Sequence, residues 1–221
     1  MPLPPLKRVW IALVLCSPVA SVIWAVRHHS HSPPAKTHPR QTARPASRSI
    51  AAALDQSRRD YDRGDFARAQ VSLNRAISEA HALGDRASEA KALVGIAACQ
   101  LDLFNYREAL KKSDAGRKLA EEVGDQVTIG ASWINRSSVF SNLGDFESAK
   151  DAAIHAVAAL DHSERPDLLV RALLLEGRLY AAAKDAAKAK DIYIRAASVA
   201  AQLKSLRWKQ LFGTNMGRHF S

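Results

Sequence analysis

A forty-residue spacing between similar short segments is the feature of this chain that most constrains its fold. The segment Gly64-Asp65-Phe66-Ala67-Arg68-Ala69 has related segments that begin at Phe104, Gly144 and Lys184. A second landmark agrees, because Ala82-Leu83-Gly84-Asp85 is followed 40 residues later by Glu122-Val123-Gly124-Asp125. Two landmarks that keep one period indicate a stack of similar units, in which each unit is stabilised by its neighbours.

Each unit is predicted to be a pair of antiparallel helices. Good helix formers run without proline through residues 86–103 and 107–123, and the short joins hold Gly and Asp, or Asn. Such joins suit a left-handed residue that ends one helix and an N-cap that begins the next. We expect the aromatic residue after the join (Phe66, Tyr106, Phe146) to wedge into the crevice of the pair. The alanine three positions on (Ala69, Ala109, Ala149, Ala189) should let the helices approach closely.

The sequence therefore predicts an all-α fold, a right-handed α-solenoid of four antiparallel helix pairs plus a partial C-terminal capping helix. The repeats should span about residues 47–84, 85–124, 125–164 and 165–203. Residues 204–221 form the expected capping helix and tail, in which Leu206, Trp208, Leu211 and Phe212 recur at helical spacing.

The third and fourth units resemble the tetratricopeptide repeat (TPR) family. The third unit matches the family's pattern at Trp133, Ser137, Phe140, Leu143, Gly144, Phe146, Ala149 and Ala156, and the fourth at Leu173, Gly177, Tyr180, Ala189, Tyr193 and Ala196. The units have 40 residues rather than about 34, and they lack the proline that usually closes a TPR unit. The pattern is thus similar to the longer, bacterial-type variety, and it implies a fold rather than one particular function.

The basic charge of the chain lies outside the predicted repeats. The chain carries 32 Lys and Arg against 22 Asp and Glu, but residues 1–48 and 204–221 contain basic residues and no acid. Residues 49–203 hold 21 basic and 22 acidic side chains and are close to neutral. This distribution does not favour nucleic-acid binding by the folded part, because such binding needs a basic folded surface.

Residues 9–26 form an apolar run without a charged side chain, long enough to cross a hydrocarbon core of about 30 Å as a helix. A single-pass membrane anchor is the leading interpretation, with the repeats outside the cytoplasm. The alternative is a removed signal peptide, because residues 19–21 resemble a cleavage site, and the protein would then be secreted or periplasmic. Residues 27–46 contain four prolines and no acid and are predicted to be a disordered basic linker.

No residue pattern indicates catalysis, a cofactor or a metal. His81, His155 and His162 lack partners at metal-ligand spacing, and Cys99 lacks a histidine partner and is expected to be a buried small side chain. Phosphate loops and nucleophile motifs are absent from the sequence. We therefore expect a protein that is not an enzyme and has no cofactor.

One row of residues is a candidate peptide-binding groove. In TPR-like stacks the first helix of each pair lines the groove, and the fifth position of each unit reads Leu54, Val94, Ile134 and Leu174. The ninth position reads Arg58, Ala98, Ser138 and Arg178. Aliphatic anchors flanked by arginines suit an extended or helical segment with an acidic or carboxylate end. The alternative is that the aliphatic side chains pack between helices and the arginines only solvate the surface.

Two functions from different classes remain open. The first is a membrane-tethered scaffold that binds a protein or peptide through the groove. The second is the regulatory N-terminal part of a larger enzyme, such as a TPR-linked CHAT (caspase-like) peptidase. An in-frame catalytic domain downstream of the chain would favour the second function.

Overall fold

The computed structural model describes residues 45–201 and residue 203. The chain divides into two units, residues 1–42 and residues 43–221, and every described residue belongs to the second. The predicted membrane segment 9–26 and the predicted capping helix and tail 204–221 lie outside the described residues. Within the described residues, no helix is apolar and long enough to span a membrane.

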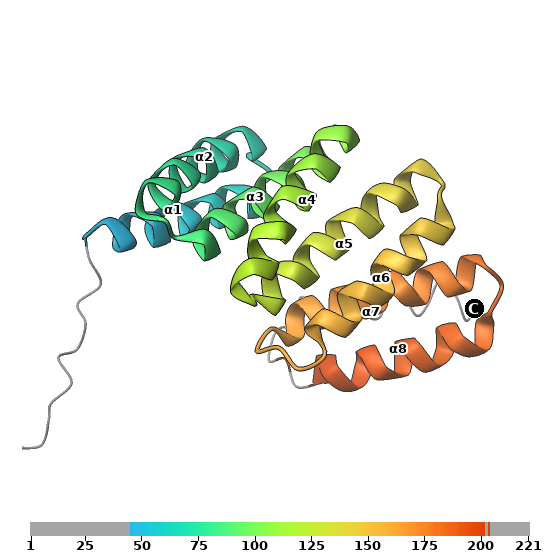
Figure 1. Cartoon of the computed structure of the whole chain (residues 1–221). Coiled ribbons are helices and arrows are strands. Elements are labelled where there is room, and N and C mark those ends of the chain that lie inside the picture. Colours follow the sequence, from blue (N-terminus) through green and yellow to red (C-terminus); the bar gives the residue numbers. More distant parts are fainter. Residues whose placement is uncertain (1–44, 202, 204–221) are drawn as a thin grey trace, which may run out of the picture. The chain divides into compact units, whose positions relative to one another are not determined.

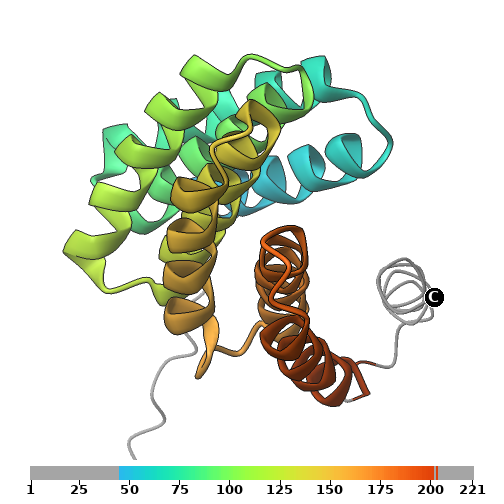
Figure 2. The ribbon, with the colours of Figure 1, turned by 90° about the vertical axis from the view of Figure 1, so that its right-hand side faces the viewer.

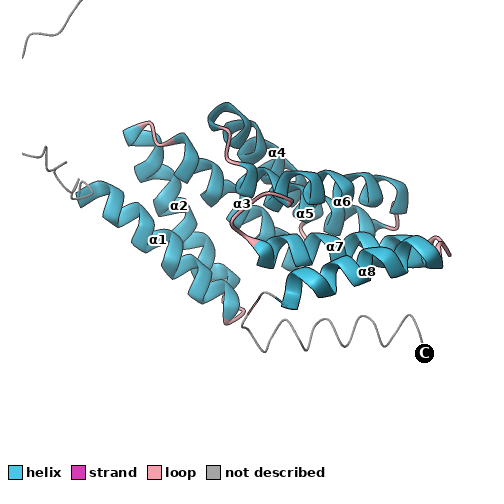
Figure 3. Cartoon of the chain, turned by 90° about the horizontal axis from the view of Figure 1, so that it is seen from below, coloured by secondary structure: helices cyan, strands magenta, loops and turns pink. Residues whose placement is uncertain are grey.

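The described residues form the predicted all-α architecture of four helix pairs (Figures 1 and 3). The first helix begins at Pro45, two residues before the predicted start of the first repeat. The elements are α1 (Pro45–Asp62), α2 (Phe66–Leu83), α3 (Arg86–Asp102), α4 (Tyr106–Val123), α5 (Gln126–Leu143), α6 (Phe146–Leu160), α7 (Pro166–Ala182) and α8 (Ala186–Ala201).

Six of the seven joins between these helices have the same construction. Each contains a left-handed residue, which is Gly64, Gly84, Phe104, Gly124, Gly144 or Lys184. The next residue donates its backbone N–H to a carbonyl five residues earlier, at 2.8 to 3.0 Å. Where that next residue is Asp, its side chain accepts a hydrogen bond from the backbone three residues on, as Asp65 does from Arg68. This is a Schellman ending joined directly to an N-cap, as the sequence predicted.

Two of these joins have a residue other than glycine in the left-handed conformation, which strains the backbone. Phe104 and Lys184 both have φ of 62°, a conformation that is unfavourable for residues with a Cβ. The join at Phe104 is weaker for a second reason, because Asn105 makes no side-chain cap bond. Its amide donates instead to Gln100 Oε1 at 2.8 Å.

Small side chains lie where the two helices of a pair meet. The four predicted alanines, Ala69, Ala109, Ala149 and Ala189, are all at most 1% exposed. The prediction for the aromatic residue at the join holds less well. Phe66 and Tyr106 are half-buried, but Phe146 is 53% exposed and does not fill a crevice. The alanines, rather than the aromatic residues, therefore make the regular contact between the helices.

The odd-numbered helices form a continuous layer. The backbone of each odd helix packs against that of the next odd helix, whereas the backbones of the even-numbered helices in the described part do not approach one another. Figure 2 shows the last pair, α7 and α8, side by side, as their contacts require. Because the odd helices lie closer together than the even helices, the stack curves, and the odd helices lie on the inner side of the curve.

We predict that Phe104→Gly will be more stable than Phe104→Ala by about 1 kcal/mol, because only glycine relieves the left-handed backbone. Both variants lose the edge-to-face contact of the Phe104 ring with Tyr106, so the comparison isolates the backbone. Urea unfolding followed by circular dichroism measures the difference. Equal stabilities would show that this join carries no backbone strain.

Candidate protein-binding surface

The inner face of the odd helices can be located from burial alone. Ala52 and Arg59 are exposed in the first pair, which has no pair before it, whereas the equivalent Ala92 and Cys99 are fully buried. The side of each odd helix that carries the positions of Ala92 and Cys99 therefore contacts the preceding pair. On the opposite side of the odd helices, the residues are exposed or half-buried in all four pairs. They form two rows at forty-residue spacing, which we call the inner surface: Ala51, Lys91, Ala131 and Arg171, and Arg58, Ala98, Ser138 and Arg178.

The predicted aliphatic row lies mainly in the packing between helices. Val94, Ile134 and Leu174 are 6%, 3% and 7% exposed, and Leu54 is half-buried. Ile134 and Leu174 belong to one buried cluster. Their burial agrees with the packing interpretation of this row. Contact of any of them with a partner stays a prediction.

The predicted polar row lies at the inner surface. Arg58 and Arg178 are exposed and Ser138 is half-buried. The structure adds Arg171, an exposed arginine that the sequence reasoning missed. The forty-residue pattern gave no signal for it, because the equivalent positions of the other units hold Ala51, Lys91 and Ala131.

The inner arginines differ from arginines that lie at contacts between consecutive or neighbouring helices. Within the described residues, Arg58, Arg171 and Arg178 form no ion pair and no hydrogen bond through their side chains. By contrast, Arg136 pairs with Asp114 at 2.6 Å, and Arg195 pairs with Asp161. The guanidinium groups of the inner surface therefore keep their donors available.

A hydrogen bond between Tyr61 and Asp102 links α1 to α3 across the inner side. Burial raises the pKa of the Tyr61 hydroxyl far above its usual value, and the bond to Asp102 raises it further. The charge of Arg171 acts in the opposite direction on the same pKa.

Lys91, the remaining basic residue of the inner surface, already has a partner. Its Nζ lies 3.4 Å from Oδ2 of Asp125, the N-cap of α5. Partial burial opposes ionisation of Asp125, but hydrogen bonds from Thr128 and the charge of Lys91 lower its pKa overall. Lys91 thus stabilises the start of α5.

The histidines and the described cysteine lie apart from one another. His81 Nδ1 lies 3.2 Å from Glu89 Oε1, and His155 stacks on Trp133 with 4.6 Å between ring centroids. Cys99 is buried, and burial raises the pKa of its thiol to about 11. No group of three potential metal ligands occurs in the described part of the chain.

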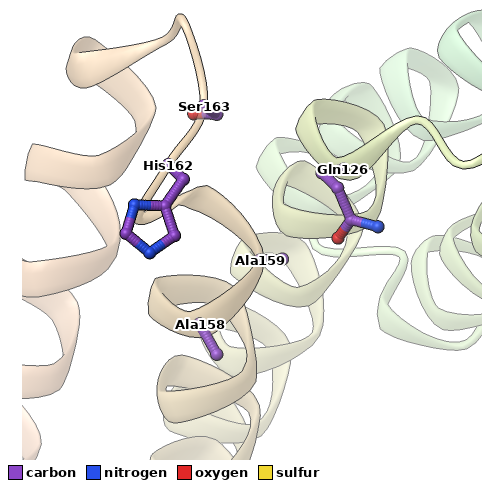
Figure 4. Close-up of a pocket in the computed structure, with 5 residues that line it drawn as sticks. All are labelled: Gln126, Ala158, Ala159, His162 and Ser163. Atoms are coloured by element: carbon purple, nitrogen blue, oxygen red, sulfur yellow. The ribbon is translucent and has the colours of Figure 1, made fainter. Parts of the chain in front are cut away.

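A small hollow of about 240 Å³ lies between the start of α5 and the join of α6 and α7 (Figure 4). Gln126, Ala158, Ala159, His162 and Ser163 line it. This is the one join of the seven that is built differently. Its residue Asp161 has a right-handed helical backbone conformation, and α7 begins with a proline. Its lining offers few polar groups that converge on one point, so it is a weak candidate for a ligand site.

Comparison with known proteins supports the fold. No protein-family model and no curated protein matches the sequence. The crystal structure of the apo form of RapI is similar, with a TM-score of 0.65 and 16% identity over 81% of this chain. The match covers 50% of the RapI chain, so this chain corresponds to about half of that protein's length. At this identity the likeness establishes a helical-repeat fold, and the resemblance to TPR units in particular stays a prediction.

We predict that Tyr61→Phe will lower the free energy of unfolding by about 1 kcal/mol, because it removes the hydrogen bond to Asp102. The edge-to-face contact with Phe66 is kept by a phenylalanine ring. Tyr106→Phe is the matched control, since the Tyr106 hydroxyl makes no hydrogen bond within the described residues. If thermal or urea unfolding shows the same loss for both variants, the Tyr61 bond does not link the first two pairs.

Proposed function

We propose that this chain is a helical-repeat interaction protein that binds a partner protein along its inner surface. One observation carries the proposal. The inner surface combines accessible arginines that have no ion-pair partner in the described residues with small side chains between them. An exposed face with available charge-assisted donors is suited to recognise another chain.

The middle of the inner surface supports the proposal sterically. Ala98 and Ser138 are half-buried small residues on α3 and α5, and Ala131 stands beside them in the other row. Small side chains leave room for a bound segment to approach the backbone of the odd helices. The helical-repeat fold, with its continuous layer of odd helices, supplies a rigid support for such a segment.

We predict that Ser138→Trp will strongly reduce capture of the partner, because a large side chain in the middle of the inner surface blocks the bound segment. Ser78→Trp is the control, since Ser78 is exposed on the even-numbered helix α2. Both full-length variants serve as bait in a crosslinking pull-down with quantitative mass spectrometry. Circular dichroism verifies that helical content is unchanged.

Proteins that depend on the position of the tryptophan are the expected specific partners. Equal capture of the partner by the Ser138→Trp and Ser78→Trp baits would show that the partner does not bind at the inner surface. Loss with both baits would indicate that the partner contacts the outer helices as well.

The proposal includes a tether to a membrane, which rests on the sequence of residues 9–26. We predict that the full chain will stay in the membrane pellet after alkaline carbonate extraction and will keep residues 9–26 at its N-terminus. Leu15→Arg combined with Val19→Arg should release it, because each charge near the centre of the segment costs about 3 kcal/mol in a membrane helix. A soluble protein that begins near residue 21 would instead favour the removed signal peptide.

A further inference from the structure

Two arginines on α7 form the strongest uncompensated charge of the inner surface. Arg171 and Arg178 are both exposed and stand seven residues apart on one helix. Seven residues are nearly two turns, so the two side chains share a face and their Cα atoms lie roughly 10 Å apart. Glu176, an acid within the same stretch, stands on the side of α7 that meets the preceding pair and is half-buried.

The other basic residues of the inner surface are compensated. Arg58 has Asp55 three residues before it and Asp62 four residues after it on α1, a spacing at which opposite charges on a helix attract. Lys91 is held by Asp125.

On α7, Asp167 stands four residues before Arg171, but its carboxylate accepts hydrogen bonds from Arg165 at 2.6 and 2.8 Å. No acid stands three or four residues from Arg178. The unpaired positive charge of the inner surface is therefore concentrated on α7.

The charge of Arg171 also acts on the pair of residues that links α1 to α3, because it lowers the pKa that burial and Asp102 raise at the Tyr61 hydroxyl. Asp102 is the acid bonded to Tyr61, and within the described residues it forms no ion pair with Arg171. An incoming acid would therefore not have to displace an existing salt bridge at Arg171.

We infer that Arg171 and Arg178 select an acidic partner segment, with two carboxylate side chains about 10 Å apart that each engage one guanidinium group. A peptide in the polyproline II conformation has three residues per turn and rises about 3.1 Å per residue, so it places side chains three residues apart on one face at about this separation. The inference rests on the proposed function and deepens it, because it assigns the chemistry of the segment that the inner surface binds. Each contact would be a charge-assisted hydrogen bond of the kind that arginine forms with carboxylates.

Fluorescence anisotropy with the purified full chain tests the inference. The probes are two capped 12-residue peptides of the same composition, labelled with a neutral dye. In one peptide two glutamates stand three residues apart in a background of Ser, Thr and Gly, and in the other they are adjacent. A third peptide replaces both glutamates with glutamine, and a 12-nucleotide strand of thymidine represents a phosphate backbone.

The protein variants are matched in charge. Arg171→Gln with Arg178→Gln removes the α7 pair and keeps long polar side chains in place. Arg86→Gln with Arg107→Gln removes two exposed arginines that also lack ion pairs in the described residues but stand at the first turns of α3 and α4. We expect the first variant to bind the spaced peptide about tenfold more weakly, and the second to change its affinity less than about twofold.

Several results would overturn the inference. These are equal losses in the two variants, equal binding of the spaced and adjacent peptides, binding of the glutamine peptide as tight as that of the spaced peptide, or no binding of the spaced peptide. Tighter binding of the DNA strand that is lost with Arg171 and Arg178 would assign the pair to phosphates instead. Failure here is distinguishable from failure of the proposed function, since Ser138→Trp tests the inner surface whatever the chemistry of the partner.

Discussion

The construction of the helix joins is the constraint on which the rest of the stack depends. A left-handed residue reverses the chain, and the next residue both closes the old helix and begins the new one. Because this takes only two or three residues, consecutive helices must lie antiparallel and in contact. The join between α6 and α7 uses another solution, with a proline in the first turn of α7, yet the two helices still contact each other. A stack of pairs follows from the joins, provided that the helices can approach closely.

Close approach depends on side chains that are small or missing. A Cβ added to Gly130 would lie 2.4 Å from Cγ of Leu160, and one added to Gly177 would lie 2.8 Å from the ring of Tyr193. Glycine within a helix costs about 1 kcal/mol relative to alanine, so these positions give up helix propensity in exchange for packing. Leu160 and Tyr193 are fully buried and fill the space that the glycines leave. Stability in this protein thus comes mainly from the contact of faces, and less from the helices taken singly.

The sequence predicts the joins and the packing alanines well because both are decided locally or within one pair. It predicts less well whether other repeated positions are buried or exposed, because the burial of a side chain also depends on the neighbouring pair. Phe66 and Phe146 occupy the same position of their units, but Phe66 contacts the ring of Tyr61 whereas Phe146 is exposed. For the same reason the aliphatic row that suggested a groove is largely buried. Arg171 could not be singled out from the pattern, because its equivalents in the other units are Ala51, Lys91 and Ala131.

Arginines at different places in the stack act in different ways. Between α4 and α5, Arg117 and Arg136 lie over the ring of Trp133 while Arg136 also pairs with Asp114, so these charges hold the two helices together. Exposed ion pairs contribute only about 0 to 1 kcal/mol each, so leaving the inner arginines unpaired costs the fold little. The inner surface is therefore free to carry charge for recognition, because the joins and the buried small residues already hold the pairs in place. In this protein the fold and the candidate binding chemistry depend on different residues of the same helices.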